Sequence, residues 1–162
     1  QLQIESMTNS SGDKKINFNH PVKELIWTSG ADYGTAQLKL NGHDRFAARN
    51  FTYFTRVQVW EHHSGAGGLN CSNGAEQGKF NDSIGVYSFA LKPEEHQPSG
   101  TCNFSRIDNA QLVGIDLNTD ADGNTPKDIG NAQANNVKLT IFAVNYNVLR
   151  IMSGMGGLAY SN

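Results

Sequence analysis

The stretch of sequence that decides the fold is SFALKPEEHQPSGTCNFSRID, residues 88–108. Its two prolines and Gly100 constrain the backbone at separate points, which predicts an ordered loop over residues 94–101 between two strands. Glu94 and Glu95 are adjacent carboxylates, a pair that could support acid–base chemistry. Neighbouring side chains on an extended chain point to opposite faces, so these two are poorly placed to act together. We therefore expect this segment to have a packing or interface role rather than a catalytic one.

The composition around this stretch favours a single all-β domain. The chain has 162 residues, a length typical of one domain, and its 17 glycines indicate many turns between short strands. Its 13 Lys and Arg residues nearly balance 15 Asp and Glu residues, for a formal net charge of −2. This balance argues against a nucleic-acid-coating surface, which normally carries a basic stripe. The sequence has no apolar run near the roughly 20 residues needed to span a membrane.

Hydrophobic alternation predicts about eight strands and little helix, arranged as a jelly-roll sandwich over residues 1–162. Leu2 and Ile4 predict a half-buried strand, and Asn41–Gly42 predicts a tight turn. The connection over 44–63 is expected to contain a short helical piece followed by extended chain, and 152–157 to be flexible, with 158–160 returning to the body. The other expected strands are residues 16–18, 22–27, 37–40, 84–91, 103–107, 111–117 and 137–151.

No motif predicts a metal or a cofactor. A metal site needs about three protein ligands, and the adjacent His62 and His63 would diverge on a strand. The acidic run 116–123 resembles part of a calcium loop, but the twelfth position is Ile129 where a bidentate Glu is required. We interpret that run as a solvated acidic loop.

The glycine-rich and aromatic residues do not predict ligand binding either. The run 152–157 lacks the Lys-Ser/Thr ending of a phosphate-binding loop. Trp27, Tyr53, Phe54 and Trp60 could stack on bases or sugars, but aromatic residues in an all-β domain usually belong to the core, and no basic pattern accompanies them.

Cysteines and glycosylation sequons leave two questions open. Cys71 and Cys102 are expected to be unpaired thiols because disulfides are rare in the cytosol, although a bond between them stays open. Asn-x-Ser/Thr sequons matter only where the glycosylation machinery reaches the protein. Asn70 and Asn81 border a predicted loop and are the candidate glycosylation sites. The other sequons are at Asn9, Asn50 and Asn103, of which Asn103 lies in a segment expected to be tightly packed.

Four separated segments stand in a fixed order along the chain: FNHPVKELIW (18–27), LKLNGHDRF (38–46) continued by Tyr53-Phe54 and Val57-Gln58, the stretch 88–108, and NYNVLRIMSGMGGLAYSN (145–162). Together they resemble one protein family: the major capsid proteins of large icosahedral double-stranded DNA viruses, such as phycodnaviruses and iridoviruses. Loops at 30–36, 64–79 and 118–136 do not clearly match, as expected for variable surface loops.

The resemblance implies a structural protein without enzymatic activity. Members of this family have two jelly rolls in one chain, and this chain resembles only the second, C-terminal one. Since it begins with Gln1 rather than Met, we expect a processed product or a part of a longer chain. The resemblance further implies a homotrimeric, pseudo-hexagonal capsomer with six jelly rolls, tiling an icosahedral shell.

The implied partners are other copies of the protein, its own N-terminal jelly roll and minor capsid proteins, with no direct nucleic-acid binding. The implied location is the virion, after assembly in the host cytoplasm. Arg45, Arg106 and Arg150 are candidates for ordering the contacts through paired hydrogen bonds.

Two other function classes compete with the capsid interpretation. A jelly-roll carbohydrate-binding module would use loop aromatics with Asp and Asn side chains to hold a sugar. A cupin-type metalloenzyme would need a His-x-His arrangement near a Glu, and the sequence contains no His-x-His.

Overall fold

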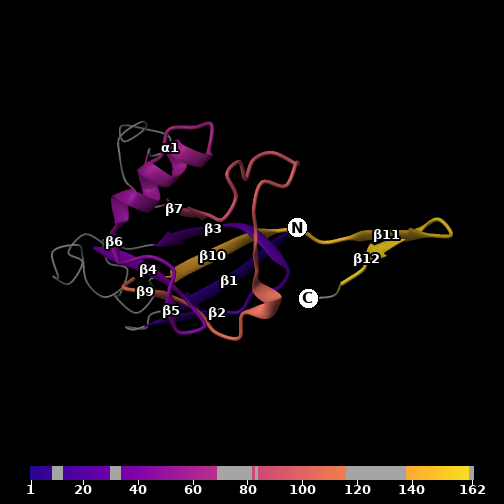
Figure 1. Ribbon diagram of the computed structural model, residues 1–162, viewed down its shortest axis with the longest axis horizontal. Helices are drawn as coiled ribbons and strands as arrows, with labels where there is room; N and C mark the ends of the chain where they lie inside the picture. Colours follow the sequence, from indigo (N-terminus) through magenta and orange to yellow (C-terminus); the bar gives the residue numbers. More distant parts are fainter. Residues whose placement is uncertain (9–12, 30–33, 69–81, 83, 116–137, 161–162) are drawn as a thin grey trace.

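The computed structural model describes residues 1–8, 13–29, 34–68, 82, 84–115 and 138–160. Two antiparallel sheets pack face to face, a short helical segment lies at one end, and a β-hairpin projects from the other (Figure 1). The all-β jelly-roll prediction is confirmed, with more strands than expected because several are only two to four residues long. Among the described residues, no helix is both long and apolar enough to cross a membrane.

The first sheet has the strand order β1-β10-β3-β7. Its members are β1 (Leu2–Thr8), β10 (Lys138–Asn145), β3 (Pro21–Ser29) and β7 (Ile84–Ser88). Beyond the end of β7, the two-residue strand β8 (Cys102–Asn103) continues the pairing with β3. The first and last long strands of the chain are thus neighbours, and β3 lies in the middle of the sheet.

The second sheet has the order β2-β9-β4-β5, with β6 also pairing with β4. Its bounds are β2 (Lys14–Ile16), β9 (Ala110–Val113), β4 (Thr35–Leu40), β5 (His43–Asp44) and β6 (Arg49–Asn50). The predicted turn between β4 and β5 is confirmed, since Asn41 and Gly42 have φ values of 51° and 78°. In each sheet a late strand lies between two early ones, β10 between β1 and β3 and β9 between β2 and β4, which fits jelly-roll connectivity.

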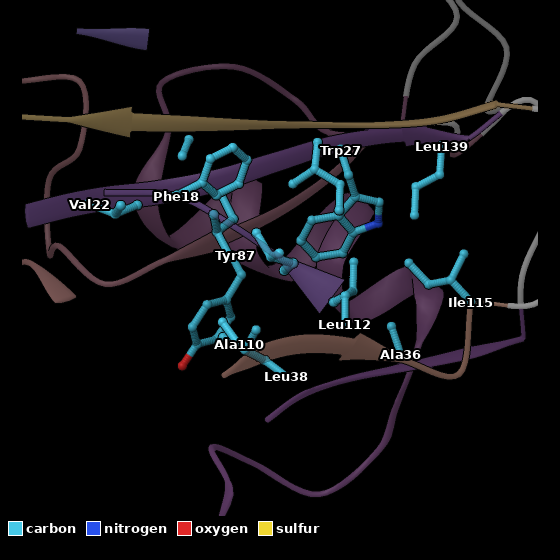
Figure 2. Packing of buried hydrophobic residues seen from close by; sticks show 14 of the residues in the cluster. Phe18, Val22, Trp27, Ala36, Leu38, Tyr87, Ala110, Leu112, Ile115 and Leu139 are labelled. Atoms are coloured by element: carbon cyan, nitrogen blue, oxygen red, sulfur yellow. The ribbon is translucent and has the colours of Figure 1, made fainter. Parts of the chain in front are cut away.

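Trp27 lies at the centre of the core between the two sheets (Figure 2). Its side chain is 1% exposed, and its ring centroid is 5.2 Å from that of Phe54. Both sheets contribute apolar side chains to the same cluster, which includes Leu25, Leu38, Leu112, Leu139, Ile141 and Ala143. The aromatic residues Trp27 and Phe54 are therefore core residues, as predicted.

The connection over 44–63 has the opposite order from the one predicted. Extended chain in β5 and β6 comes first, and the π-helical turn Tyr53–Val57 and helix α1 (Gln58–His62) follow. Helical spacing buries Phe54, Thr55 and Gln58 on one side of this segment. The aromatic cluster that looked aperiodic for a strand is thus explained by burial of one helical face.

Several predicted strands differ in extent from the structure: the predicted strand 16–18, for example, is β2 (Lys14–Ile16) and shares only Ile16 with it. β7 ends at Ser88 rather than residue 91, and β9 ends at Val113, before Gly114, whose φ is 87°. The predicted strand 103–107 is β8 followed by the 3-10 turn Phe104–Arg106, because the Asn103 side chain accepts a hydrogen bond from the Ser105 N–H and starts the turn. The run 137–151 is interrupted after Asn145 and contains two strands.

The two ends of the chain also differ from expectation. Strand β1 forms, but Leu2 and Ile4 are 52% and 60% exposed, so the predicted buried face is the solvent face. Residues 152–157 are not a flexible loop: they complete a hairpin of β11 (Leu149–Met152) and β12 (Met155–Leu158). Its turn is made by Ser153 and Gly154, with φ values of 51° and 78°.

A methyl group at Gly85 is predicted to destabilise the core. Gly85 pairs with Trp27 across β7 and β3, and a Cβ atom there would lie 2.5 Å from the indole ring. Overpacking of this kind costs typically about 1–3 kcal/mol, so Gly85→Ala should lower the free energy of unfolding in urea by that amount. Gly65→Ala is the control, because a Cβ atom added at Gly65 would have no other atom within 4 Å. Equal stability of the two variants would contradict this packing account.

Candidate assembly surface

A bulge in β3 positions the 88–108 segment. Glu24 lies opposite Val144, but Val22 lies opposite Asn145, so Lys23 is an extra residue in the pairing with β10. On the other edge of β3, the pairing with β7 ends at the same position, and β8 pairs with β3 beyond it. The Lys23 carbonyl accepts hydrogen bonds from the backbone N–H groups of Phe89 and Ala90, at 2.8 and 3.2 Å.

The Lys23 side chain extends this contact into the loop. It is 9% exposed, and its ammonium donates to the Pro93 carbonyl at 2.5 Å and to the Glu95 carbonyl at 3.3 Å. The same ammonium lies 5.3 Å from the centroid of the Tyr146 ring. A buried charge requires such partners, so Lys23 fixes the loop against the sheet.

A second polar cluster holds the loop to the end of α1. The ring nitrogens of His63 lie 2.8 Å from the Glu24 carboxylate and 3.2 Å from the Glu94 carboxylate. Ser64 donates its backbone N–H and hydroxyl to Glu94, which lowers the pKa of that carboxyl group. The hydrogen bond to Glu24, followed by the one to Glu94, raises the pKa of His63 against the opposing effect of burial.

The far end of the segment is fixed by backbone and ring contacts. His20 donates its N–H to the Ser105 hydroxyl at 2.8 Å and accepts from the Phe104 N–H at 3.0 Å. Phe104 is 2% exposed, and its ring makes edge contacts with Phe18 and Phe89. The prediction of an ordered loop is therefore confirmed along the 88–108 segment.

These clusters are structural rather than catalytic in geometry. Glu94 binds His63 and Ser64, whereas Glu95 pairs with Lys92, so the adjacent carboxylates do not share a site. His62 accompanies His63 at the end of a helix, not on the predicted strand, and its Nδ1 lies 3.0 Å from the Leu91 carbonyl oxygen. Within the described part of the chain, no group of three or more His, Cys, Asp or Glu residues is arranged to hold a metal ion.

The three predicted contact arginines lie in separate places. Arg45 follows β5 and lies beside the Tyr87 hydroxyl, where it opposes the burial that raises the pKa of Tyr87. Arg106 is exposed in the 3-10 turn, and Arg150 is exposed on β11. Arg45 therefore has a contact inside the domain, and the interface roles of all three stay predictions.

Some predicted positions fall outside the described residues. These are the candidate glycosylation sites Asn70 and Asn81, the acidic loop 116–123, and Cys71. Cys102 is half-buried, and burial raises the pKa of its thiol. Cys102 is a free thiol in the structure. Asn103 is exposed rather than packed.

The β11–β12 hairpin, hereafter the arm (Leu149–Leu158), is an exposed apolar feature that the sequence patterns did not predict. Each residue of β11 and β12 is exposed, including Leu149 at 65%, Ile151 at 68% and Met155 at 75%. The arm extends away from the body along the long axis of the molecule (Figure 1). In the sequence, the arm is marked only by apolar residues placed among glycines. The same pattern is typical of a flexible loop, so it did not indicate a hairpin.

The root of the arm lies against the 88–108 segment. A hollow of about 440 Å³ is bordered by residues from both, including Asn103, Ser105 and Val148. Tyr160 also borders it, and its carbonyl accepts a hydrogen bond from the Asn147 side chain at 3.0 Å. The chain after the arm therefore returns to the body at Tyr160, whereas Leu158, which was also predicted to return, still belongs to β12.

A second exposed apolar surface lies at the opposite end, along α1. A groove of about 340 Å³, hereafter the α1 groove, is lined by Arg56, Val57, Trp60, Glu61, Ala66 and Gly67. Trp60 is 81% exposed, so the expectation that it belongs to the core is wrong. Arg56 is paired with Asp82, which also accepts from the buried Thr55 hydroxyl at 2.8 Å.

Removing the Lys23 ammonium should loosen the 88–108 segment. Lys23→Met leaves the Pro93 and Glu95 carbonyls without their charged donor. Hydrogen bonds to charged groups contribute about 1.5–3 kcal/mol, so the free energy of unfolding should fall by about that much. Amide hydrogen exchange should accelerate at Phe89 and Ala90. The exposed Lys15→Met is the matched control and should change neither quantity; an unaffected Lys23→Met would contradict the account.

Stability should depend on pH through His63. The folded-state pKa of His63 is raised, so its contribution is fully present below the unfolded value of about 6.5 and is lost as pH rises through the folded value. Urea unfolding of the wild type should therefore lose stability from about pH 6.5 upward, and His63→Gln should remove that loss. The exposed His43→Gln should retain it. Identical pH profiles for wild type and His63→Gln would disprove the assignment.

Comparison with known proteins agrees with this architecture. Residues 29–157 match the family model described as large eukaryotic DNA virus major capsid protein. The chain is 47% identical to the major capsid protein of Pyramimonas orientalis virus, with all of this chain and 42% of the relative covered. It is 39% identical to the major capsid protein of Paramecium bursaria Chlorella virus 1, with 96% of this chain and 44% of the relative covered.

A solved structure shows the same fold. PBCV-1 VP54, fitted into a reconstruction of the virophage Sputnik, superposes with a TM-score of 0.73 at 31% identity, covering all of this chain and 50% of VP54. The chain thus spans half or less of the length of these relatives. With the family model matching most of its residues, the chain belongs to the family of major capsid proteins of large eukaryotic DNA viruses.

Proposed function

We propose that this chain is a structural building block of a viral capsid, acting through buried interfaces rather than chemistry. The observation that carries the proposal is the arm, an exposed apolar hairpin that projects from the jelly roll. An exposed apolar surface of this kind marks an interaction site in a stable protein. The family is one of capsid proteins, which supplies the kind of partner.

We propose that the chain is the C-terminal jelly roll of a protein with two. Support comes from its coverage of 50% of VP54 and of 42% and 44% of two relatives. The N-terminal jelly roll would then be an intramolecular partner. The surfaces available for it include the exposed Leu2 and Ile4 on β1 and the hollow at the root of the arm.

Three such proteins would form a pseudo-hexagonal capsomer, and capsomers would tile an icosahedral shell together with minor capsid proteins. The protein would then reside in the virion, after assembly in the host cytoplasm. Direct nucleic-acid binding is not proposed, because the net charge is −2 and the predicted contact arginines Arg45, Arg106 and Arg150 lie apart.

No observation favours the carbohydrate-binding alternative. That function would require aromatic platforms at the surface, and Trp27 and Phe54 are 1% and 0% exposed. Trp60 is exposed, but it borders the apolar α1 groove rather than a group of Asp and Asn side chains.

The assembly proposal predicts a trimer in solution. Multi-angle light scattering of the full-length polypeptide should give three times the mass of one chain, and electron microscopy should show particles with a pseudo-hexagonal outline. The 162-residue chain alone and the chain mixed with its other half are the comparison samples. A strictly monomeric species at every concentration, even with the other half present, would refute the proposal.

A further inference from the structure

We propose that the arm of one copy docks into the α1 groove of a neighbouring copy, with Arg150 of the arm facing Glu61 of the groove. This contact would be the link between chains in the proposed capsomer, so it rests on the proposed function. Arm and groove are both exposed and apolar, and they lie at opposite ends of one molecule (Figure 1).

The arm needs a partner because of its construction. A single two-stranded hairpin is marginally stable in water at best. Its register places Arg150 opposite Gly157 and Met152 opposite Met155, so these side chains share one face. Met152 and Met155 are 54% and 75% exposed. Methionine side chains adapt to irregular surfaces, so this face suits insertion into a groove.

The α1 groove is a preformed receptor. Trp60 and Val57 are 81% and 41% exposed and provide its apolar surface. At Gly67, which also lines the groove, a Cβ atom would lie 2.1 Å from the Thr55 carbonyl oxygen, so the backbone is closely packed there. A tryptophan in such a position is a typical hot spot of protein interfaces, and arginine is another.

The charges of the two surfaces are complementary. Arg150 is the one charged residue in the sequence from Val148 to Tyr160. In the groove, Arg56 is neutralised by its ion pair with Asp82. Glu61 has a side chain 53% exposed and a 4.0 Å contact with His62. The groove therefore offers a carboxylate where the arm offers a guanidinium, a pairing that favours bidentate hydrogen bonds.

The positions of the two surfaces require the contact to be made between molecules. The arm points away from the body that carries α1 (Figure 1). A contact between different patches is head-to-tail, which generates a closed ring or an open chain. A ring of three would fit the proposed trimer. A lipid surface is a poorer occupant, because membrane-surface segments are rich in Lys and Arg and the arm has one arginine.

Charge reversal tests the contact. Self-association of the 162-residue chain is measured by sedimentation equilibrium for the wild type, Arg150→Glu, Glu61→Arg and the double variant. Each single reversal should raise the dissociation constant about tenfold or more, and the double reversal should restore it to within about threefold of the wild type. Lys15→Glu and Asp13→Arg make the same changes in net charge at exposed positions and should have no effect.

Mixing the two single variants distinguishes contact between molecules from contact within one. In a mixture, the substituted arm of the Arg150→Glu chain meets the substituted groove of the Glu61→Arg chain. The native Arg150 of the Glu61→Arg chain in turn meets the native Glu61 of the Arg150→Glu chain. Both contacts are then complementary in an alternating assembly, so the mixture should associate more tightly than either variant alone. An odd-numbered ring would retain one mismatched contact, so even-numbered species should be enriched.

Several results would overturn the inference. These are a monomeric wild-type chain at the highest concentration, single variants that associate like the wild type, or a mixture that behaves like its components. The inference is also overturned if Arg150→Glu abolishes binding of the separately supplied N-terminal half but leaves self-association unchanged, because the arm would then contact that half and not a second copy. A full-length Arg150→Glu protein that still forms trimers with wild-type affinity would remove the arm contact and leave the proposed function intact. Full-length wild type that never forms trimers would refute the proposed function.

Discussion

The bulge at Lys23 is the constraint on which the arrangement of this surface depends. It places one extra residue in the central strand β3 where β7 ends and β8 begins. The Lys23 carbonyl accepts hydrogen bonds from the N–H groups of Phe89 and Ala90, directly after β7. The Lys23 ammonium donates to the Pro93 and Glu95 carbonyls of the same loop. A bulge commonly redirects a strand and its side chains. Here it turns one position of the sheet into the attachment point of the 88–108 segment.

The consequence is a division between a rigid body and an exposed arm. Lys23 and the His63 cluster hold the 88–108 segment to β3 and to the end of α1. The arm, in contrast, has no core of its own and leaves both faces in solvent. Such a division suits an assembling protein: the body keeps its shape, and association stabilises the part that is least stable alone.

Local patterns predicted most elements and a jelly-roll sandwich, and the family resemblance, confirmed by the family match, implied the same fold. The Asn41–Gly42 turn follows from backbone conformation alone, because both residues tolerate positive φ. The errors arose where tertiary contacts outweigh local pattern. Phe54 is helical because one helical face is buried, and Ile4 is exposed although it alternates with polar residues like a half-buried strand residue. Alternation reveals a strand but not which of its faces meets the core.

By itself, the sequence determined the all-β class, the main turns and the identity of the family, since backbone preferences and ordered motifs are local properties of the chain. The separation of Glu94 from Glu95 was predicted for a different reason from the one observed: the two lie in a turn, where the Glu95 N–H donates to the Lys92 carbonyl, and not on extended chain, yet their carboxylates still have separate partners. Only the tertiary structure decided that Lys23, Glu24 and His63 meet the 88–108 segment, and that the arm and the α1 groove lie at opposite ends. These relations join residues far apart in sequence, and their physical cause is the register of the sheet, which no local window contains.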